Sequence, residues 1–258
     1  MSITTETTIS SGRKPADTNR QAAIKESKMK ITTTNLIRWA GLSAMVAGII
    51  FAAIQPIHPP DILSSVTTSP FIIITAFKTA MCVFGLFGIA GLYARQVEKI
   101  GWLGLVGYLL LTLFYMVQMC YAFMEPLVLP LLANVTPAFV ESALGVGSGA
   151  GGPMNLGAFA TIYGLNSMLY LLSLLLFGIA MFRARILPRG AAVLFALSGP
   201  LAFVLVAILP HQLARLAAMP MGFALIWLGY ALLTERRSPA SEIVSGQVSP
   251  QLSGTVAK

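Results

Sequence analysis

Six long apolar segments constrain what this chain can fold into more than any other feature. They cover residues 36–55, 70–94, 101–124, 156–182, 190–209 and 212–233, and more polar turns separate them. An α-helix rises about 1.5 Å per residue, so about 20 residues cross the hydrocarbon core of a bilayer. Helices also satisfy their own backbone hydrogen bonds in lipid. The pattern therefore predicts an all-α, polytopic membrane bundle of six transmembrane helices.

The composition excludes the common alternatives to a membrane protein. Charged residues make up 10% of the chain, against about 25% in an ordinary soluble domain. So few charges cannot cover a soluble globule, and a hydrophobic content of 56% excludes a disordered chain. The 2 cysteines also exclude a disulfide scaffold. One membrane domain is expected over residues 36–234.

Two polar tails flank this domain. Residues 1–35 are rich in Ser, Thr, Lys and Arg, and residues 235–258 are rich in Ser, Gly and Pro. Neither tail has the apolar periodicity of a packed element, so both are predicted to be disordered. Met29 is an alternative to Met1 as the translation start, and the sequence leaves that choice open.

The basic residues predict how the helices are oriented. Of the 17 Lys and Arg residues, all but Lys78 and Arg215 lie in the tails or at the helix ends on the same side as the tails. The positive-inside rule then places both termini in the cytoplasm. The net charge of +8 is explained as a topology signal, and nucleic-acid binding is not expected.

Polar residues in the outer half of the segments predict a ligand-binding pocket. A lysine inside an apolar segment, such as Lys78, is costly in a membrane and is a candidate for function. The helical period places polar residues of the third and fourth segments on single faces. The predicted ligand-binding residues are Lys78, Tyr115, Gln118, Glu125, Tyr163 and Asn166. The alternative is a structural role, in which Lys78 is buried and paired.

The polar residues at the outer ends of the helices can also be interpreted as a metal site. The three helices that run outward each end with a proline beside a titratable residue, namely His58, Glu125 and His211. Two histidines and one carboxylate can hold zinc or another divalent metal and leave a position open for water. That set would make the chain a membrane-embedded metal-dependent hydrolase; otherwise no cofactor is expected. The simpler reading is that proline ends each helix and polar residues sit at a wet interface.

The inner half of the segments favours binding over ion-coupled transport. Its polar side chains are hydroxyls, with no acid, base or amide to relay a charge to the cytoplasm. The leading prediction is therefore an outward-facing small-molecule or lipid binding protein, a sensor or a transporter-like module rather than an enzyme. A structural or assembly subunit without a ligand is a third alternative, and the oligomeric state is left open. The other charged residues of the outer half are Asp61, Glu141 and Arg215.

Local patterns carry three further expectations. Ala40, Ala44, Gly48 and Ala52 form a stripe of small residues, which predicts close helix packing. In the long outer loop, the apolar residues 127–133 suggest a short re-entrant or interfacial helix, and the glycine-rich run 145–152 suggests a flexible lid or linker. The sixth helix is expected to start near Gln212 and to kink at Pro220.

Four short motifs resemble those of a family of bacterial six-helix membrane proteins. They are Gln55-Pro-Ile-His-Pro-Pro, Phe87-Gly-Ile-Ala, Gly101-Trp-Leu-Gly and Leu209-Pro-His. The resemblance covers residues 36–237 and omits both tails. It implies a location in the bacterial inner membrane. The family has no assigned activity, so the resemblance implies no functional residue.

Overall fold

The computed structural model describes residues 32–209 and 211–235. Its contacts divide the chain into residues 1–36 and residues 37–258, and the description that follows concerns the second unit. The tails predicted over residues 1–35 and 235–258 lie outside the described residues, except for their innermost positions.

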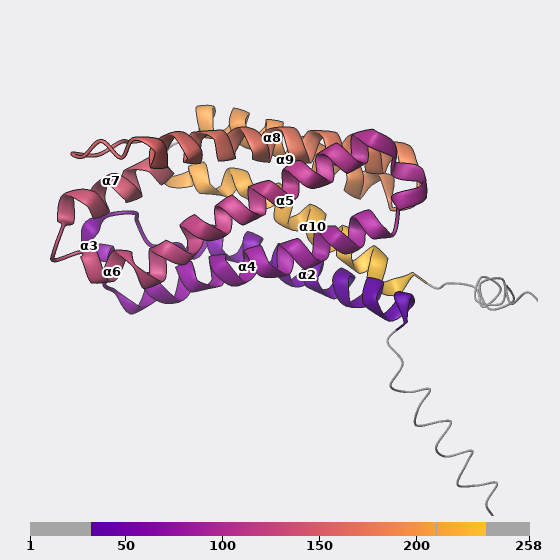
Figure 1. Cartoon of the computed structure of the whole chain (residues 1–258), viewed down its shortest axis with the longest axis horizontal. Coiled ribbons are helices and arrows are strands. Elements are labelled where there is room, and N and C mark those ends of the chain that lie inside the picture. Colours follow the sequence, from indigo (N-terminus) through magenta and orange to yellow (C-terminus); the bar gives the residue numbers. More distant parts are fainter. Residues whose placement is uncertain (1–31, 210, 236–258) are drawn as a thin grey trace, which may run out of the picture. The chain divides into compact units, whose positions relative to one another are not determined.

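Six helical spans are long and apolar enough to cross a membrane, which confirms the all-α, multi-pass architecture (Figure 1). Large apolar side chains are exposed along them, as on Trp102, whose exposed fraction is 81%. Such a surface suits lipid rather than water. The first five spans are α2 (Thr33–Ile57), α4 (Ser69–Ala94), α5 (Val97–Leu127), α8 (Ala158–Ala184) and α9 (Arg189–Ile208).

The sixth span differs from the expected kinked helix. A 3₁₀ helix, η1 (His211–Ala218), leads into the α-helix α10 (Met219–Thr234). Pro220 lies in the first turn of α10, where its missing N–H has no helical partner to lose. The proline therefore marks the start of the α-helix and not a bend inside it.

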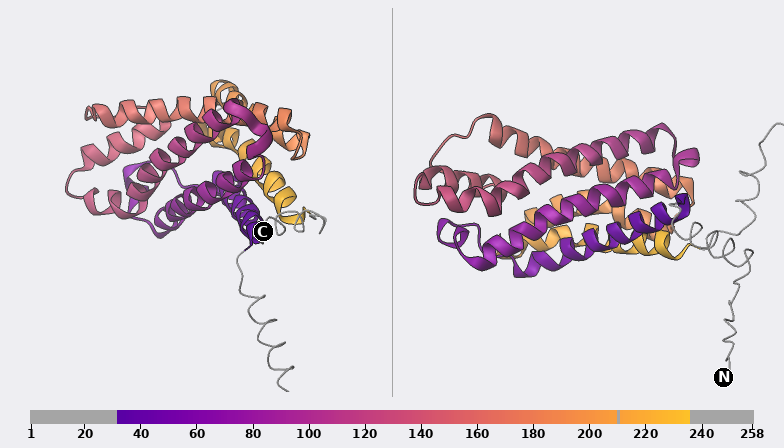
Figure 2. Two further views of the ribbon diagram at one scale, coloured as in Figure 1. Left: turned by 45° about the vertical axis from the view of Figure 1, so that its right-hand side comes forward. Right: turned by 60° about the horizontal axis from the view of Figure 1, so that its bottom comes forward.

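Three short helices lie at one end of the bundle, which we call the distal end; the opposite end is the proximal end (Figures 1 and 2). They are α3 (Leu63–Val66), α6 (Leu129–Leu132) and α7 (Pro137–Ser148). The short helix expected within residues 127–133 is α6. The sequence predicts a flexible lid or linker for the glycine-rich run, but α7 extends through its first residues and ends at Ser148, where Gly149, with a φ of 73°, caps the helix.

Glycine allows the first and last spans to approach closely. A Cβ atom at Gly48 would lie 2.5 Å from the Gly222 carbonyl oxygen, and one at Gly229 would lie 2.5 Å from the Gly41 carbonyl oxygen. Any larger residue at these positions would overlap the backbone of the neighbouring helix. The predicted small-residue stripe is thus used in packing, with Gly48 against α10 and Ala44 against α4.

α5 and α8 run antiparallel in one register over most of their length. Moving toward the distal end, the facing pairs are Gly107 and Phe177, Phe114 and Tyr170, Gln118 and Asn166, and Tyr121 and Tyr163. Each step forward along α5 matches an equal step back along α8. This register sets the polar faces of the two helices opposite each other.

Candidate functional site

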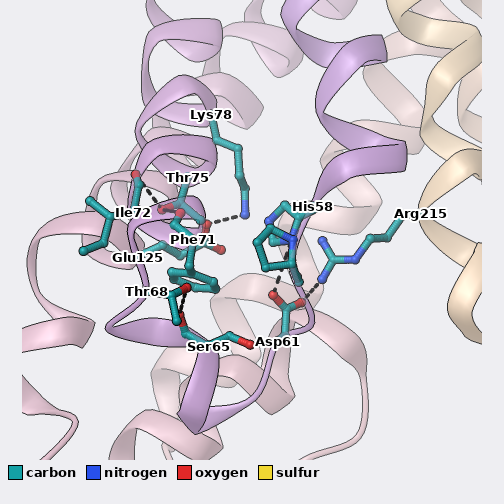
Figure 3. Close-up of polar contacts among 11 residues, drawn as sticks. His58, Asp61, Ser65, Thr68, Phe71, Ile72, Thr75, Lys78, Glu125 and Arg215 are labelled. Carbon is teal, nitrogen blue, oxygen red and sulfur yellow. Dashed lines mark hydrogen bonds and ion pairs between the residues drawn. The ribbon is translucent and has the colours of Figure 1, made fainter.

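An ion pair joins α4 to α5 in the distal half of the bundle. The Lys78 ammonium group donates a hydrogen bond to the Glu125 carboxylate, and Figure 3 shows the lysine side chain reaching toward it. Both side chains are largely buried, with exposed fractions of 15% for Lys78 and 22% for Glu125. The structure thus places together two of the predicted ligand-binding residues, and a paired Lys78 is compatible with both the pocket and the structural alternative.

A second ion pair lies beside the first and was not predicted. The Arg215 guanidinium of η1 donates a hydrogen bond to Asp61, which follows α2. The only signal in the sequence was that both residues carry charge at the distal end. Four charged side chains from four separate segments therefore meet there, two positive and two negative.

His58 lies between the two ion pairs (Figure 3). Its side chain is only 2% exposed, and its ring packs edge-on against Phe71 with 6.1 Å between the ring centroids. Nδ1 lies 2.7 Å from the Pro59 carbonyl oxygen and 3.8 Å from an Asp61 carboxylate oxygen. A carbonyl can only accept a hydrogen bond, so Nδ1 carries the proton and Nε2 is left as an acceptor.

Burial, together with nearby positive charges, keeps the His58 ring neutral. Burial lowers its pKa from 6.5 to about 4, and the positive charges of Lys78 and Arg215 act in the same direction. The Pro59 carbonyl and Asp61 oppose this shift without cancelling it. Nε2 is buried and has no hydrogen-bond partner among the described residues. The cluster therefore presents an unprotonated, buried nitrogen at neutral pH.

The other predicted residues line the interface of α5 and α8. The Asn166 side-chain amide donates a 2.9 Å hydrogen bond to the Gln118 side-chain oxygen. Tyr163 packs edge-on against Tyr121, with 4.8 Å between the centroids. Tyr115 is fully buried one turn deeper than Gln118. All six residues of the predicted pocket thus lie on α4, α5 and α8 in the distal half, and their role in binding a ligand stays a prediction.

A small cavity separates the charged cluster from α7. Its volume is about 20 Å³, which is about the room that one water molecule needs. Both carboxylates line it, from Asp61 and Glu125, together with the aromatic residues Tyr121, Phe159 and Tyr163. A wider, open pocket of about 500 Å³ lies between α3 and the α6–α7 segment, where Glu141 contributes a carboxylate.

The predicted metal set is only partly described. His58 and Glu125 lie in the distal half, but the side chain of His211 is outside the described residues. Among the described side chains, no group of three or more His, Cys, Asp and Glu residues is arranged to hold a metal ion. The binding of zinc or another divalent metal therefore stays a prediction.

Comparisons with known proteins add no further constraint. No protein-family model, no curated protein and no solved structure matches the chain. The resemblance to bacterial six-helix membrane proteins therefore stays a prediction from the four motifs. What is established is a multi-pass, all-α membrane protein with a charged cluster at one end of its bundle.

Proposed function

We propose that this protein binds a small polar molecule or a lipid headgroup in the distal half of its membrane bundle. The observation that carries the proposal is the convergence of two ion pairs and a neutral histidine beside a cavity that Asp61 and Glu125 line. Charged side chains within a membrane domain are costly, and they mark binding sites and pathways in other membrane proteins. Six apolar helices can pack against one another without buried ion pairs, so packing alone does not account for two such pairs from four segments.

The lining of the cavity favours a ligand that donates hydrogen bonds. Asp61 and Glu125 line it, while their cationic partners Arg215 and Lys78 lie outside the lining. Three aromatic side chains surround the same space, and aromatic faces attract cations. An ammonium or hydroxyl group, carried by a soluble molecule or by a lipid headgroup, suits this chemistry.

The proposed orientation opens the site to the outside of the cell. The described basic residues Arg95, Lys99, Arg183, Arg185 and Arg189 all lie at the proximal end. The positive-inside rule then makes that end, and both termini, cytoplasmic. With the bacterial inner membrane that the family resemblance implies, the distal cluster faces the outer side. A sensor or a transporter-like module is the kind of protein that uses such a site.

One observation favours the metal-dependent hydrolase as a second candidate. A histidine binds metal through an unprotonated nitrogen, and Nε2 of His58 is unprotonated, with no hydrogen-bond partner in the part of the chain that the structure describes. His58, Glu125 and His211 would hold the ion, which would activate a water molecule for hydrolysis. Glu125 would then exchange its present partner, Lys78, for the metal.

Native mass spectrometry of the full chain tests the binding function. We expect the protein, purified in mild detergent, to carry a bound small molecule or lipid. A separate lipid extract identifies which of the two it is. Lys78→Gln/Glu125→Gln removes both charges of one pair without leaving either unpaired, and we expect it to lose the adduct. A matched control removes the proximal ion pair with Arg95→Gln/Glu235→Gln, where Arg95 Nε donates a 2.7 Å hydrogen bond to Glu235.

Other outcomes point to the other candidates. A bound molecule that survives Lys78→Gln/Glu125→Gln, or no bound molecule at all, would contradict the proposed site and favour a structural subunit. Metal analysis of the same sample addresses the hydrolase. Stoichiometric metal that disappears in His58→Ala would support it, and no stoichiometric metal in protein purified without chelator would exclude it.

A further inference from the structure

Besides Nε2 of His58, four buried polar side-chain atoms in the distal half of the bundle have no hydrogen-bond partner among the described residues. They are the hydroxyl oxygens of Thr79, Tyr115 and Tyr170 and the side-chain amide oxygen of Asn166. Buried polar side-chain atoms are nearly always paired, with protein, ordered water or a ligand. Four such atoms on three neighbouring helices, α4, α5 and α8, need a common explanation.

We call the four residues that carry these atoms the column; they lie on α4 (Thr79), α5 (Tyr115) and α8 (Asn166 and Tyr170). The register of α5 and α8 sets Asn166 opposite Gln118, and Tyr170 one turn deeper beside Phe114. The Phe114 ring contacts both tyrosine rings, with 5.3 Å between its centroid and that of Tyr115 and 5.2 Å to that of Tyr170. Thr79 follows Lys78 on α4 and lies one turn beyond the buried Thr75.

The column extends from the level of the charged cluster to Tyr115, which lies near the middle of α5. Tyr115 lies ten residues before Glu125 on α5, which corresponds to about 15 Å along the helix axis. At its deep end Tyr115 fits against Gly85, where a Cβ atom would lie 2.5 Å from the tyrosine ring. Beyond it Leu111 and Phe177 are fully buried, and the buried Ser173 hydroxyl already donates a 3.2 Å hydrogen bond to the Tyr170 carbonyl oxygen.

We propose that this column is a hydrogen-bonding site for neutral polar groups, entered from the distal cluster and closed at Tyr115. The unpartnered atoms comprise three hydroxyls, which can donate and accept, and one amide oxygen, which only accepts. None is charged, so the column suits hydroxyl groups rather than an ion. Those hydroxyls belong to bound water or to a hydroxyl-bearing ligand.

The inference extends the proposed binding site inward, and it rests on different residues. Lys78 and Glu125 supply none of the unpartnered atoms. A loss of ligand in the Lys78→Gln/Glu125→Gln variant therefore tests only the mouth of the site. The state of Tyr115 and Tyr170 tests the column, so either proposal can fail alone.

X-ray hydroxyl-radical footprinting of the full chain in lipid nanodiscs tests the column. Radicals form from water, so a buried side chain is oxidised only where water is bound beside it. We expect Tyr115 and Tyr170 to be oxidised several-fold faster than Phe177 and Phe195, after each rate is divided by that of the denatured protein. Phe177 and Phe195 are the controls, because both are fully buried outside the column.

A second variant identifies the source of the hydroxyls. Asn166→Leu removes the accepting oxygen from the column. Rapid oxidation of the tyrosines with no small molecule in the native mass spectrum assigns the column to water. A bound molecule that shields the tyrosines from oxidation and is lost in Asn166→Leu assigns the column to a ligand. Either of these two results supports the proposal. Protection of all four aromatic residues, with no molecule lost in Asn166→Leu, would overturn it.

Discussion

Lys78 and Glu125, which are 47 residues apart in the chain, pair their side chains inside the distal half of the bundle. The pair joins two consecutive antiparallel spans at a level where neither charge is fully in water. Removing one partner leaves the other as an uncompensated charge in a poorly solvated place. The contribution of the pair to stability is therefore best measured by removing its members singly and together.

We expect Lys78→Met to lower the free energy of unfolding by about 2–4 kcal/mol, because a buried pair that loses one member is strongly destabilised. Both side chains are still partly exposed, so we expect a loss of unfolding free energy toward the lower end of the values typical for buried ion pairs. Lys78→Gln/Glu125→Gln should recover most of the loss, since it leaves no lone charge. Thermal unfolding in detergent measures both variants. A double variant as unstable as the single one would show that the pairing contributes little.

Stability should fall in mild acid through His58. Its pKa is 6.5 in an unfolded chain and about 4 in the folded protein. Between these values the unfolded chain takes up a proton that the folded protein refuses, so the contribution is complete above pH 6.5 and is lost as the pH falls toward 4. The full difference is about 3 kcal/mol.

The measurement is Tm at pH 7.5 and at pH 4.5, for the natural protein and for His58→Gln. The groups that face the ring are Asp61, Lys78 and Arg215. A glutamine keeps a polar side chain there but does not titrate, so the fall in Tm between the two pH values should shrink. An equal fall in both proteins would assign the acid sensitivity to other groups.

The contact between α2 and α10 should tolerate no side chain at Gly48. A methyl group there would overlap the backbone of Gly222, so Gly48→Ala should cost about 2 kcal/mol or more. Gly164→Ala is a matched control on α8, where a Cβ atom would meet nothing within 4 Å. That change should stabilise the helix by about 0.5–1 kcal/mol. Equal effects of the two substitutions on Tm would contradict the close packing.

The orientation of the bundle can be checked by labelling single cysteines in intact cells, after both natural cysteines are replaced by serine. Ser64→Cys lies at the distal end and Lys99→Cys at the proximal end, where Lys99 is exposed. A membrane-impermeant thiol reagent should modify the first and spare the second until the cells are opened. Modification of Lys99→Cys alone would reverse the orientation, and with it the side on which the site opens.

The spans were predictable because lipid imposes a length and a composition on each of them. The three- and four-residue spacing also predicted that Gln118 and Glu125 share a face of one helix, and that Tyr163 and Asn166 share a face of another. Spacing alone does not say which faces meet. That depends on the rotation and register of α5 and α8, which the Gly107–Phe177 contact and its neighbours set.

The pair of Arg215 and Asp61 lay beyond prediction for a different reason. The two residues are 154 positions apart, and both lie outside the regular α-helices. No periodicity places their side chains, so the sequence showed only that both carry charge at one end. Pro220 is a similar case, because a proline is compatible with a bend inside a helix and with the first turn of a new one.

The glycine contacts between α2 and α10 also bear on the order in which the protein is made. The ribosome synthesises α2 first and α10 last, so the glycine surface of α2 enters the membrane without its neighbour. The carbonyl groups of Gly222 and Gly229 reach that surface only after the final span has been inserted. A nascent chain that stops before Met219 therefore carries five spans and leaves Gly41 and Gly48 without the helix against which they pack.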